Sequence, residues 1–382
     1  MKNDSVMSLS ELVDAGVVQL TRGKIISKKD IAAYPGSYPV YSSAKESDGK
    51  FGEYGRYLFD EELITWSVDG GGRLFHRPKH KFSVTNVGGV LRILNRSILD
   101  YRYLFYALTL RHSEIAFDWV KKAHPSVIRK LYTNISIPPL TEQLRIVGVL
   151  DEAFAGLATA QANAEENLQN ARALFESHLQ SVFTRRGKGW FVNKVSEIAK
   201  HSLGKMLDKA KNKGNLQLYL RNINVRWFTF DLSDLLEMPF LPNEADKYTA
   251  VKGDVLICEG GYPGRAAIWN EDYPIYFQKA LHRVRFHQSE CNKWFVYYLY
   301  AQYKSGELKQ HFSGTGIQHF TGEVLARFEI PLPPLPELRR AVAKFDALSV
   351  ETQRLEGLYQ KKLTSLAALK KSLLHQAFSG QL

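Results

Sequence analysis

A long internal repeat constrains this chain more than any other feature of its sequence. Residues 137–184 return 195 positions later as residues 332–379, with no insertion or deletion between the two copies. The residues that recur in the first copy are Pro138, Pro139, Leu140, Glu142, Arg145, Val147, Asp151, Leu168, Ala173, Leu174, Ser177, Leu179 and Phe183. Solenoid repeats are roughly 20–50 residues long. The repeat period here is 195 residues, so each repeat unit is a domain plus a spacer. The chain is an internal duplication.

Each copy opens on a double proline and continues as one predicted helix. Proline excludes helix before it, and Glu142 and Glu337 complement the positive end of a helix dipole in the first turn. Apolar residues then follow alternating steps of three and four, which predicts a coiled-coil seam. The first seam runs through Val147, Leu150, Phe154, Leu157, Gln161, Ala164, Leu168, Ala171, Phe175, His178 and Val182. The second runs through Phe345, Leu348, Thr352, Leu355 and Tyr359, then slips by four to Leu363, Leu366, Leu373 and Ala377.

Two helices of this kind, each roughly 65 Å long, most simply bury their apolar stripes against each other as an antiparallel pair. Long helical hairpins are plain scaffolding in many proteins. The duplication favours a more specific interpretation, in which the helices hold two equivalent domains apart, as the two half-site readers of a dimeric DNA-binding protein are held.

The segments outside the repeat, residues 1–136 and 185–331, are dense in aromatic, β-branched and turn residues. Short strands are predicted at 63–67, 89–94, 254–258 and 281–286, with helices at 101–110 and 294–303. We therefore expect an α+β chain with a pseudo-two-fold internal repeat: two mixed α/β domains, 1–136 and 185–331, separated by two long antiparallel coiled-coil helices, 137–184 and 332–382. The domains share a skeleton, because Gly23-Lys24 matches Gly204-Lys205.

The charge balance favours a nucleic-acid partner. The chain has 51 Lys plus Arg against 39 Asp plus Glu, a net charge of +12, and such an excess attracts a phosphate backbone. Basic proteins also bind RNA, membranes or no acidic partner. The cysteines, Cys258 and Cys291, form no CxxC pair or disulfide framework, and neither an apolar signal core nor a long apolar run occurs. We expect a soluble cytoplasmic protein.

These motifs together carry a family resemblance. The paired IPPLTEQLRIV and LPPLPELRRAV blocks, the closing SLLHQAFSGQL and the segment AVKGDVLICEGGYPGRAAIW at 250–269 resemble the specificity (S) subunits of Type I restriction-modification systems. The resemblance covers essentially the whole chain. Thr141, Leu144 and Leu338 depart from the usual pattern of the proline-glutamate blocks.

The resemblance implies a non-catalytic recognition subunit. Each variable domain would be a target recognition domain that reads one half of a bipartite double-stranded DNA site, and the helices would set the spacing and dock two methyltransferase (modification) subunits. Restriction (motor-nuclease) subunits would add to that complex. The sequence agrees, because it has no NPPY-type loop, no GxGxxG and no phosphate-binding GxxxxGK[ST] loop. We expect no cofactor, and no metal site at His76 and His80, since Pro78 breaks the helix that their spacing requires.

The residues expected to contact DNA are cations and amides on glycine-rich loops. In the first domain they are Arg22, Lys24, Lys28, Lys29, Arg73, His76, Arg77, Lys79, Lys81, Lys121, Lys122 and His124. In the second they are Lys205, Lys209, Lys211, Arg221, Asn222, Arg226, Arg265, Lys279, Thr315, Gln318 and His319. The loops at His124 and His319 lie 195 positions apart and are expected at equivalent places. For any one of these residues the alternative is an ordinary solvated charge.

Two other functions stay open at this point. One is a stand-alone nucleic-acid-binding adaptor that has the same architecture without methyltransferase partners. The other, a self-sufficient DNA-modifying enzyme, is disfavoured by the missing motifs.

Overall fold

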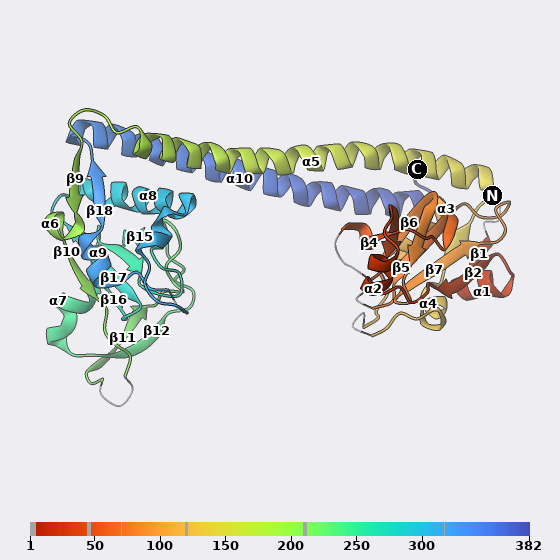
Figure 1. Ribbon diagram of the computed structural model, residues 1–382, viewed down its shortest axis with the longest axis horizontal. Helices are drawn as coiled ribbons and strands as arrows, with labels where there is room; N and C mark the ends of the chain where they lie inside the picture. The colour runs from red at the N-terminus through yellow and green to blue at the C-terminus, as the bar shows by residue number, and fades with distance from the viewer. Residues whose placement is uncertain (1–4, 44–46, 70, 119–120, 209–211, 317) are drawn as a thin grey trace. The chain divides into compact units, whose positions relative to one another are not determined.

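The computed structural model describes the chain except for residues 1–4, 44–46, 70, 119–120, 209–211 and 317. The fold divides into two compact units (Figure 1). Unit 1 comprises residues 1–164 and 361–382, and unit 2 comprises residues 165–360. Each unit therefore contains one mixed α/β domain and one part of each long helix.

The two long helices are α5 (Leu140–Thr184) and α10 (Leu335–Phe378), as the double prolines predict. They pack antiparallel within each unit (Figure 1). In unit 1, Arg145 donates to the Leu382 carbonyl and Lys370 lies over the Phe154 ring, so rising numbers in α5 meet falling numbers in α10. The predicted seams are buried or half-buried at every position except Gln161, which is exposed. The coiled-coil prediction is confirmed.

Unit 1 contains a six-stranded sheet in the order β2-β7-β5-β6-β3-β4, in which only β3 and β6 are parallel neighbours. The strands are β2 (Val18–Arg22), β3 (Tyr38–Tyr41), β4 (Lys50–Tyr54), β5 (Phe59–Ser67), β6 (Leu74–Val84) and β7 (Gly88–Ile93). A separate pair joins β1 (Ser5–Met7) to β8 (Ile135–Ile137). The helices of the domain are α1 (Leu9–Asp14), α2 (Lys28–Ala33), α3 (Tyr101–His112) and α4 (Pro125–Leu131), with a 3-10 turn at Ser47–Gly49.

Unit 2 contains two four-stranded sheets, β10-β17-β14-β15 and β12-β11-β16-β13. Their strands are β10 (Ala199–Leu203), β11 (Asn215–Leu220), β12 (Leu236–Phe240), β13 (Thr249–Ala250), β14 (Val255–Cys258), β15 (Ala266–Ile268), β16 (Ile275–Phe277) and β17 (Leu281–Phe286). A separate pair joins β9 (Phe191–Lys194) to β18 (Glu329–Leu332). The helices are α6 (Val195–Ile198), α7 (Ala245–Tyr248), α8 (Glu290–Ser305) and α9 (Gly322–Arg327), with 3-10 turns at Pro242–Glu244 and Glu307–His311.

The strand register shows that the two domains are copies of one scaffold. Leu91 of β7 pairs with Leu20 and Ile64, and Val284 of β17 pairs with His201 and Val255 in the same pattern. The main difference is at β6, which is one continuous strand. In unit 2 residues 269–274 divide its counterpart into β15 and β16, so one sheet becomes two.

The core of each unit is built around a helix that is buried nearly all round, which is expected of a helix enclosed by other elements. In unit 1 this helix is α3, and its apolar cluster includes residues of α1, β5, β7, α5 and α10. In unit 2 it is α8, whose Trp294 indole donates to the Pro331 carbonyl at 2.8 Å. The six strand and helix predictions made from the sequence are confirmed.

Candidate nucleic-acid interface

The matched glycine–lysine pairs lie at equivalent backbone crossings. A Cβ on Gly23 would stand 2.0 Å from the Val84 carbonyl oxygen, and one on Gly204 would stand 2.2 Å from that of Gln278. Only glycine fits such a crossing. The amide that follows each glycine donates across it: Lys24 to Val84 at 3.0 Å and Lys205 to Phe277 at 3.1 Å.

The side chains of these two lysines differ sharply. Lys24 is exposed. Lys205 is buried, and its ammonium donates to the Glu244 carboxylate at 2.5 Å and to the Pro239 carbonyl at 2.9 Å. The ammonium of Lys205 is therefore already neutralised inside unit 2, whereas Lys24 is available to a phosphate.

Strand β6 carries four of the cations that were expected to contact DNA. Lys79 and Lys81 are exposed, and the Lys81 ammonium lies 4.9 Å from the Tyr57 ring centroid. His76 is paired with Glu62 at 2.8 Å. Arg77 is buried against the Tyr41 ring at 3.5 Å, and burial lowers its pKa to about 10. The guanidinium of Arg77 is therefore held in the domain interior.

The remaining candidates of unit 1 lie on loops and helix starts. Lys28 and Lys29 begin α2 and are exposed, as are Arg73 and Lys121. Arg22 donates from Nε to the Asn86 carbonyl at 2.8 Å, and Lys122 approaches Asp69 at 3.7 Å. His124 is the residue before α4.

In unit 2 the structure brings a subset of the candidates into one network. Asn222 Nδ2 donates to the Gly260 carbonyl at 3.0 Å, and Arg265 donates to the Asn222 carbonyl at 2.9 Å while stacking on Tyr262. His319 pairs with both Gly260 and Ser313 in antiparallel bridges. These contacts join the loops around residues 222, 260 and 319.

Other candidates lie outside that network. Arg221 is paired with Asp234 at 2.7 Å and Arg226 with Asp231 at 3.3 Å. Lys279, Thr315 and Gln318 are exposed. Lys209 and Lys211 lie outside the residues that the structure describes.

The loops at His124 and His319 do occupy equivalent places, with a small shift in numbering. The Ala123 amide donates to the Val68 carbonyl at 2.8 Å, and the Phe320 amide donates to the Glu259 carbonyl at 2.7 Å. Ala123 and Phe320 are 197 positions apart, two more than the 195 positions that separate the repeated helices. This correspondence makes Val68 the counterpart of Glu259. Glu259 was not among the candidates chosen from the sequence.

The long helices expose a surface that the duplication repeats. Most residues shared by the two copies face the helix seam or the domain interior. Ala173, Leu174 and Ser177 of α5, and their repeats Ala368, Leu369 and Ser372 of α10, are exposed instead. Leu174 is 65% exposed and Leu369 is 46% exposed. Packing within either unit therefore does not explain why these side chains are the same in both copies.

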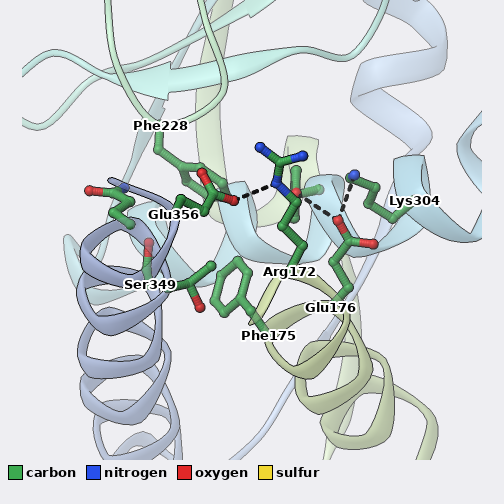
Figure 2. A pocket seen from close by; sticks show the side chains of 10 residues that line it. Arg172, Phe175, Glu176, Phe228, Lys304, Ser349 and Glu356 are labelled. Carbon is green, nitrogen blue, oxygen red and sulfur yellow. Dashed lines mark hydrogen bonds and ion pairs between the residues drawn. The ribbon is translucent and has the colours of Figure 1, made fainter. Parts of the chain in front are cut away.

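Unit 2 also contains a pocket of about 280 Å³ between α5, α8, α10 and the Phe228 loop (Figure 2). Its cations are paired by its own carboxylates: Arg172 with Glu356 at 2.7 Å and Lys304 with Glu176 at 2.6 Å. The pocket therefore offers mainly neutralised charge, which suits a structural junction better than a ligand site.

Within the described residues, no group of three or more His, Cys, Asp or Glu side chains is placed to hold a metal ion. No helix in that part of the chain combines the length and the apolar character needed to cross a membrane.

Comparison with known proteins identifies relatives along nearly the whole chain. The family model described as "Type I restriction modification DNA specificity domain" matches residues 3–168 and 187–364. The specificity subunit of the type I restriction enzyme MjaVIII of Methanocaldococcus jannaschii is 24% identical over 376 residues, which are 91% of this chain and 86% of that protein. Two Mycoplasma pneumoniae relatives are 30% and 33% identical, and the matches span 51% and 44% of their lengths, about half.

Solved structures share the fold. A chain from a structural study of complex assembly and conformational transition in a type I restriction-modification system has a TM-score of 0.71 at 18% identity, covering 96% of this chain and 98% of that one. The HsdS subunit of Thermoanaerobacter tengcongensis has a TM-score of 0.54 at 18% identity, covering 96% and 97%.

Proposed function

Because this chain belongs to the family of type I restriction-modification DNA specificity domains, we propose that it is the non-catalytic DNA-recognition subunit of a type I restriction-modification complex. The observation that carries the proposal is the match of that family to both domains, which are copies of one scaffold. Each domain reads one half of a bipartite double-stranded target. The limits 1–136, 137–184, 185–331 and 332–382 divide the chain into reader, spacer, reader and spacer.

We assign the DNA-contacting surface to exposed lysines in unit 1 and to a half-buried polar network in unit 2. The lysines of unit 1 include Lys24, Lys28, Lys29, Lys79 and Lys81, and the network of unit 2 includes Asn222, Arg265 and His319. Lysines of the first group neutralise phosphates, whereas amides and guanidinium groups held on rigid loops suit base edges. Lys205 and Arg77 are not part of this surface, because their cationic groups are held in the interior.

The partners are two methyltransferase subunits, to which restriction subunits add. The exposed surface of Ala173, Leu174 and Ser177 and its repeat on α10 support this assignment, because one partner that binds twice requires the same surface twice. An exposed leucine contributes apolar area to an interface without stabilising the free chain. The complex acts on DNA in the cytoplasm.

Stoichiometry tests the docking surfaces. Leu174→Asp and Leu369→Asp, each alone, should reduce the number of methyltransferase subunits bound per chain from two to one in native mass spectrometry. Leu358→Asp is the matched control. Leu358 is 49% exposed on α10, but the corresponding residue in the first copy of the repeat is Asn163, so this leucine is not repeated. Retention of two subunits by both variants would reject these surfaces as docking sites.

Co-expression tests the function itself. The chain together with methyltransferase subunits should methylate adenines in a bipartite DNA motif, and neither component alone should do so. The purified chain alone should show no saturable binding of S-adenosylmethionine. The stand-alone adaptor remains the alternative, and it predicts DNA binding without any complex with a methyltransferase.

A further inference from the structure

Glu259 carries a half-buried carboxylate that lies near His319 and Lys279. It follows strand β14, and none of the described residues donates a hydrogen bond to its side chain or forms an ion pair with it. Burial raises its pKa, against the opposing effect of His319 and Lys279 nearby. Partial burial of an unpaired carboxylate costs free energy, so a fold that needed only packing at this position would select another residue.

The scaffold itself does not require an acid here. The counterpart in unit 1 is Val68, which is fully buried and accepts the equivalent backbone hydrogen bond from Ala123. The Glu259 backbone makes that bond with Phe320. The same backbone position therefore accepts an apolar side chain in one domain and a carboxylate in the other.

The loop that carries Glu259 is held rigidly. Gly260 lies against the His319 ring, since a Cβ there would stand 3.0 Å from its Nδ1. Gly261 adopts a left-handed φ of 75°, and a Cβ on it would stand 2.3 Å from the side-chain nitrogen Nδ2 of Asn222. Asn222 and His319, both expected DNA contacts, thus fix the backbone on the C-terminal side of the carboxylate.

We propose that Glu259 is a base-reading residue of unit 2, whose carboxylate accepts a hydrogen bond from the exocyclic amino group of a base in the second half-site. The inference rests on the proposed DNA-recognition function and names one chemical group that it reads. An ionised carboxylate can only accept, so phosphates, guanine O6 and N7 and thymine O4 are excluded as partners. The major-groove donors that remain are cytosine N4 and adenine N6, and carboxylates are typical partners of cytosine.

The neighbouring cations explain how a negative group is tolerated beside DNA. Lys279 and His319 lie close enough to lower the pKa of Glu259 electrostatically, and Arg265 is held at the same loop by Asn222. The positive charges of Lys279 and Arg265 offset the repulsion between the carboxylate and the phosphates. A base amino group at Glu259 supplies a hydrogen-bond donor that the described residues do not supply.

Specificity of the assembled complex tests the proposal. Methylation rates are measured on a panel of duplexes that carries each base at each position of both half-sites. Wild type should require cytosine or adenine at one position of the second half-site. Glu259→Ala should reduce discrimination at that position by about 10- to 100-fold and leave the other positions unchanged. Glu259→Gln should move the preference towards adenine, because glutamine pairs with N6 and N7 together.

The matched control is Glu271→Gln, an exposed glutamate in the 269–274 connection, which should leave every position unchanged. A Glu259→Ala complex that keeps wild-type discrimination at all positions would overturn the proposal, and so would an equal loss at every position. A wild-type complex that reads no bipartite site would instead contradict the proposed function. The base that wild type requires at this position identifies the donor: cytosine indicates N4, and adenine indicates N6.

Discussion

The Tyr106 hydroxyl donates to Asp151 at 2.6 Å, and this contact ties α3 to α5 within unit 1. The duplication repeats it in unit 2, where Tyr297 of α8 donates to Asp346 of α10 at 2.7 Å. A cation completes each site, Arg102 in the first and Lys293 in the second, both 2.6 Å from the carboxylate. The repeated aspartates therefore fasten each domain to its own long helix.

Removal of one of these hydroxyls should destabilise only the unit that contains it. Tyr106→Phe should lower the free energy of unfolding of unit 1 by about 1–2 kcal/mol, since the bond joins a buried hydroxyl to an ionised group. Urea unfolding monitored by hydrogen exchange resolves the units. Tyr57→Phe, at an exposed tyrosine, is the control, and an equal loss in both variants would argue against the fastening role.

Acid should weaken unit 2 through His282. This histidine is fully buried on β17, its Nε2 lies 3.0 Å from the Phe320 carbonyl oxygen, and burial lowers its pKa to about 4. The unfolded chain takes up the proton below its ordinary pKa of about 6.5. Stability is therefore complete above pH 6.5 and falls as the pH decreases to 4, by on the order of 3 kcal/mol.

One substitution tests whether His282 causes this loss of stability in acid. His282→Gln keeps an N–H donor for the Phe320 carbonyl but does not titrate, so the decline in the urea midpoint between pH 6.5 and 4 should become shallower. His375→Gln, at an exposed histidine of α10, should leave the decline as it is. Identical pH profiles for wild type and His282→Gln would show that another group is responsible.

The two equivalent lysines should respond in opposite ways to truncation. Lys24→Ala should weaken DNA binding evenly over sequences and lower the slope of log affinity against log salt by about one, because one phosphate contact is lost. Lys205→Ala should leave the slope unchanged and destabilise unit 2 by about 2 kcal/mol or more, because Glu244 loses its partner. A reduced slope for Lys205→Ala would place its ammonium on the DNA.

The helix pair should act as a spacer of adjustable length. The Thr352 hydroxyl donates to the Ala171 carbonyl at 3.5 Å, so these positions of α10 and α5 face each other. Insertion of four residues after Ala171 and after Glu351 lengthens each helix by about 6 Å. The residues beyond each insertion are also rotated about the helix axis by about 40° more than one full turn. The gap between the half-sites should lengthen by one or two base pairs, with both half-sites unchanged. An unchanged gap in methylation mapping would refute the spacer role.

The sequence predicts the helices and the duplicated domains well because both depend on local and periodic signals. Pro138-Pro139 and the alternating apolar seam define α5 almost by themselves. Tertiary pairing is different, and the burial of Lys205 against Glu244 depends on residues 39 positions apart. The role of Gln143 was equally hidden: it is fully buried and bonds to Asp100, Ile98 and Pro138, where its repeat Leu338 packs in an apolar cluster.

The placement of the candidate DNA-contacting side chains was the least predictable part. The sequence alone does not show whether a cationic side chain contacts solvent, a carboxylate or an aromatic ring. Arg77 and Lys24 both follow or adjoin glycine-rich segments, yet one lies on Tyr41 in the interior and the other is exposed. Glu259 was missed because its significance lies in its comparison with Val68, and these two residues are 191 positions apart, not 195 as in the repeated helices.

An exchange of one reader domain tests the central claim most directly. Residues 195–327 are replaced by the corresponding segment of another member of the family with a different target, and the methylated motif of the assembled complex is mapped over a whole genome. The half-site read by unit 2 should become that of the donor, while the other half-site and the gap stay as they were. A motif in which both half-sites change together would contradict two independent readers on one scaffold.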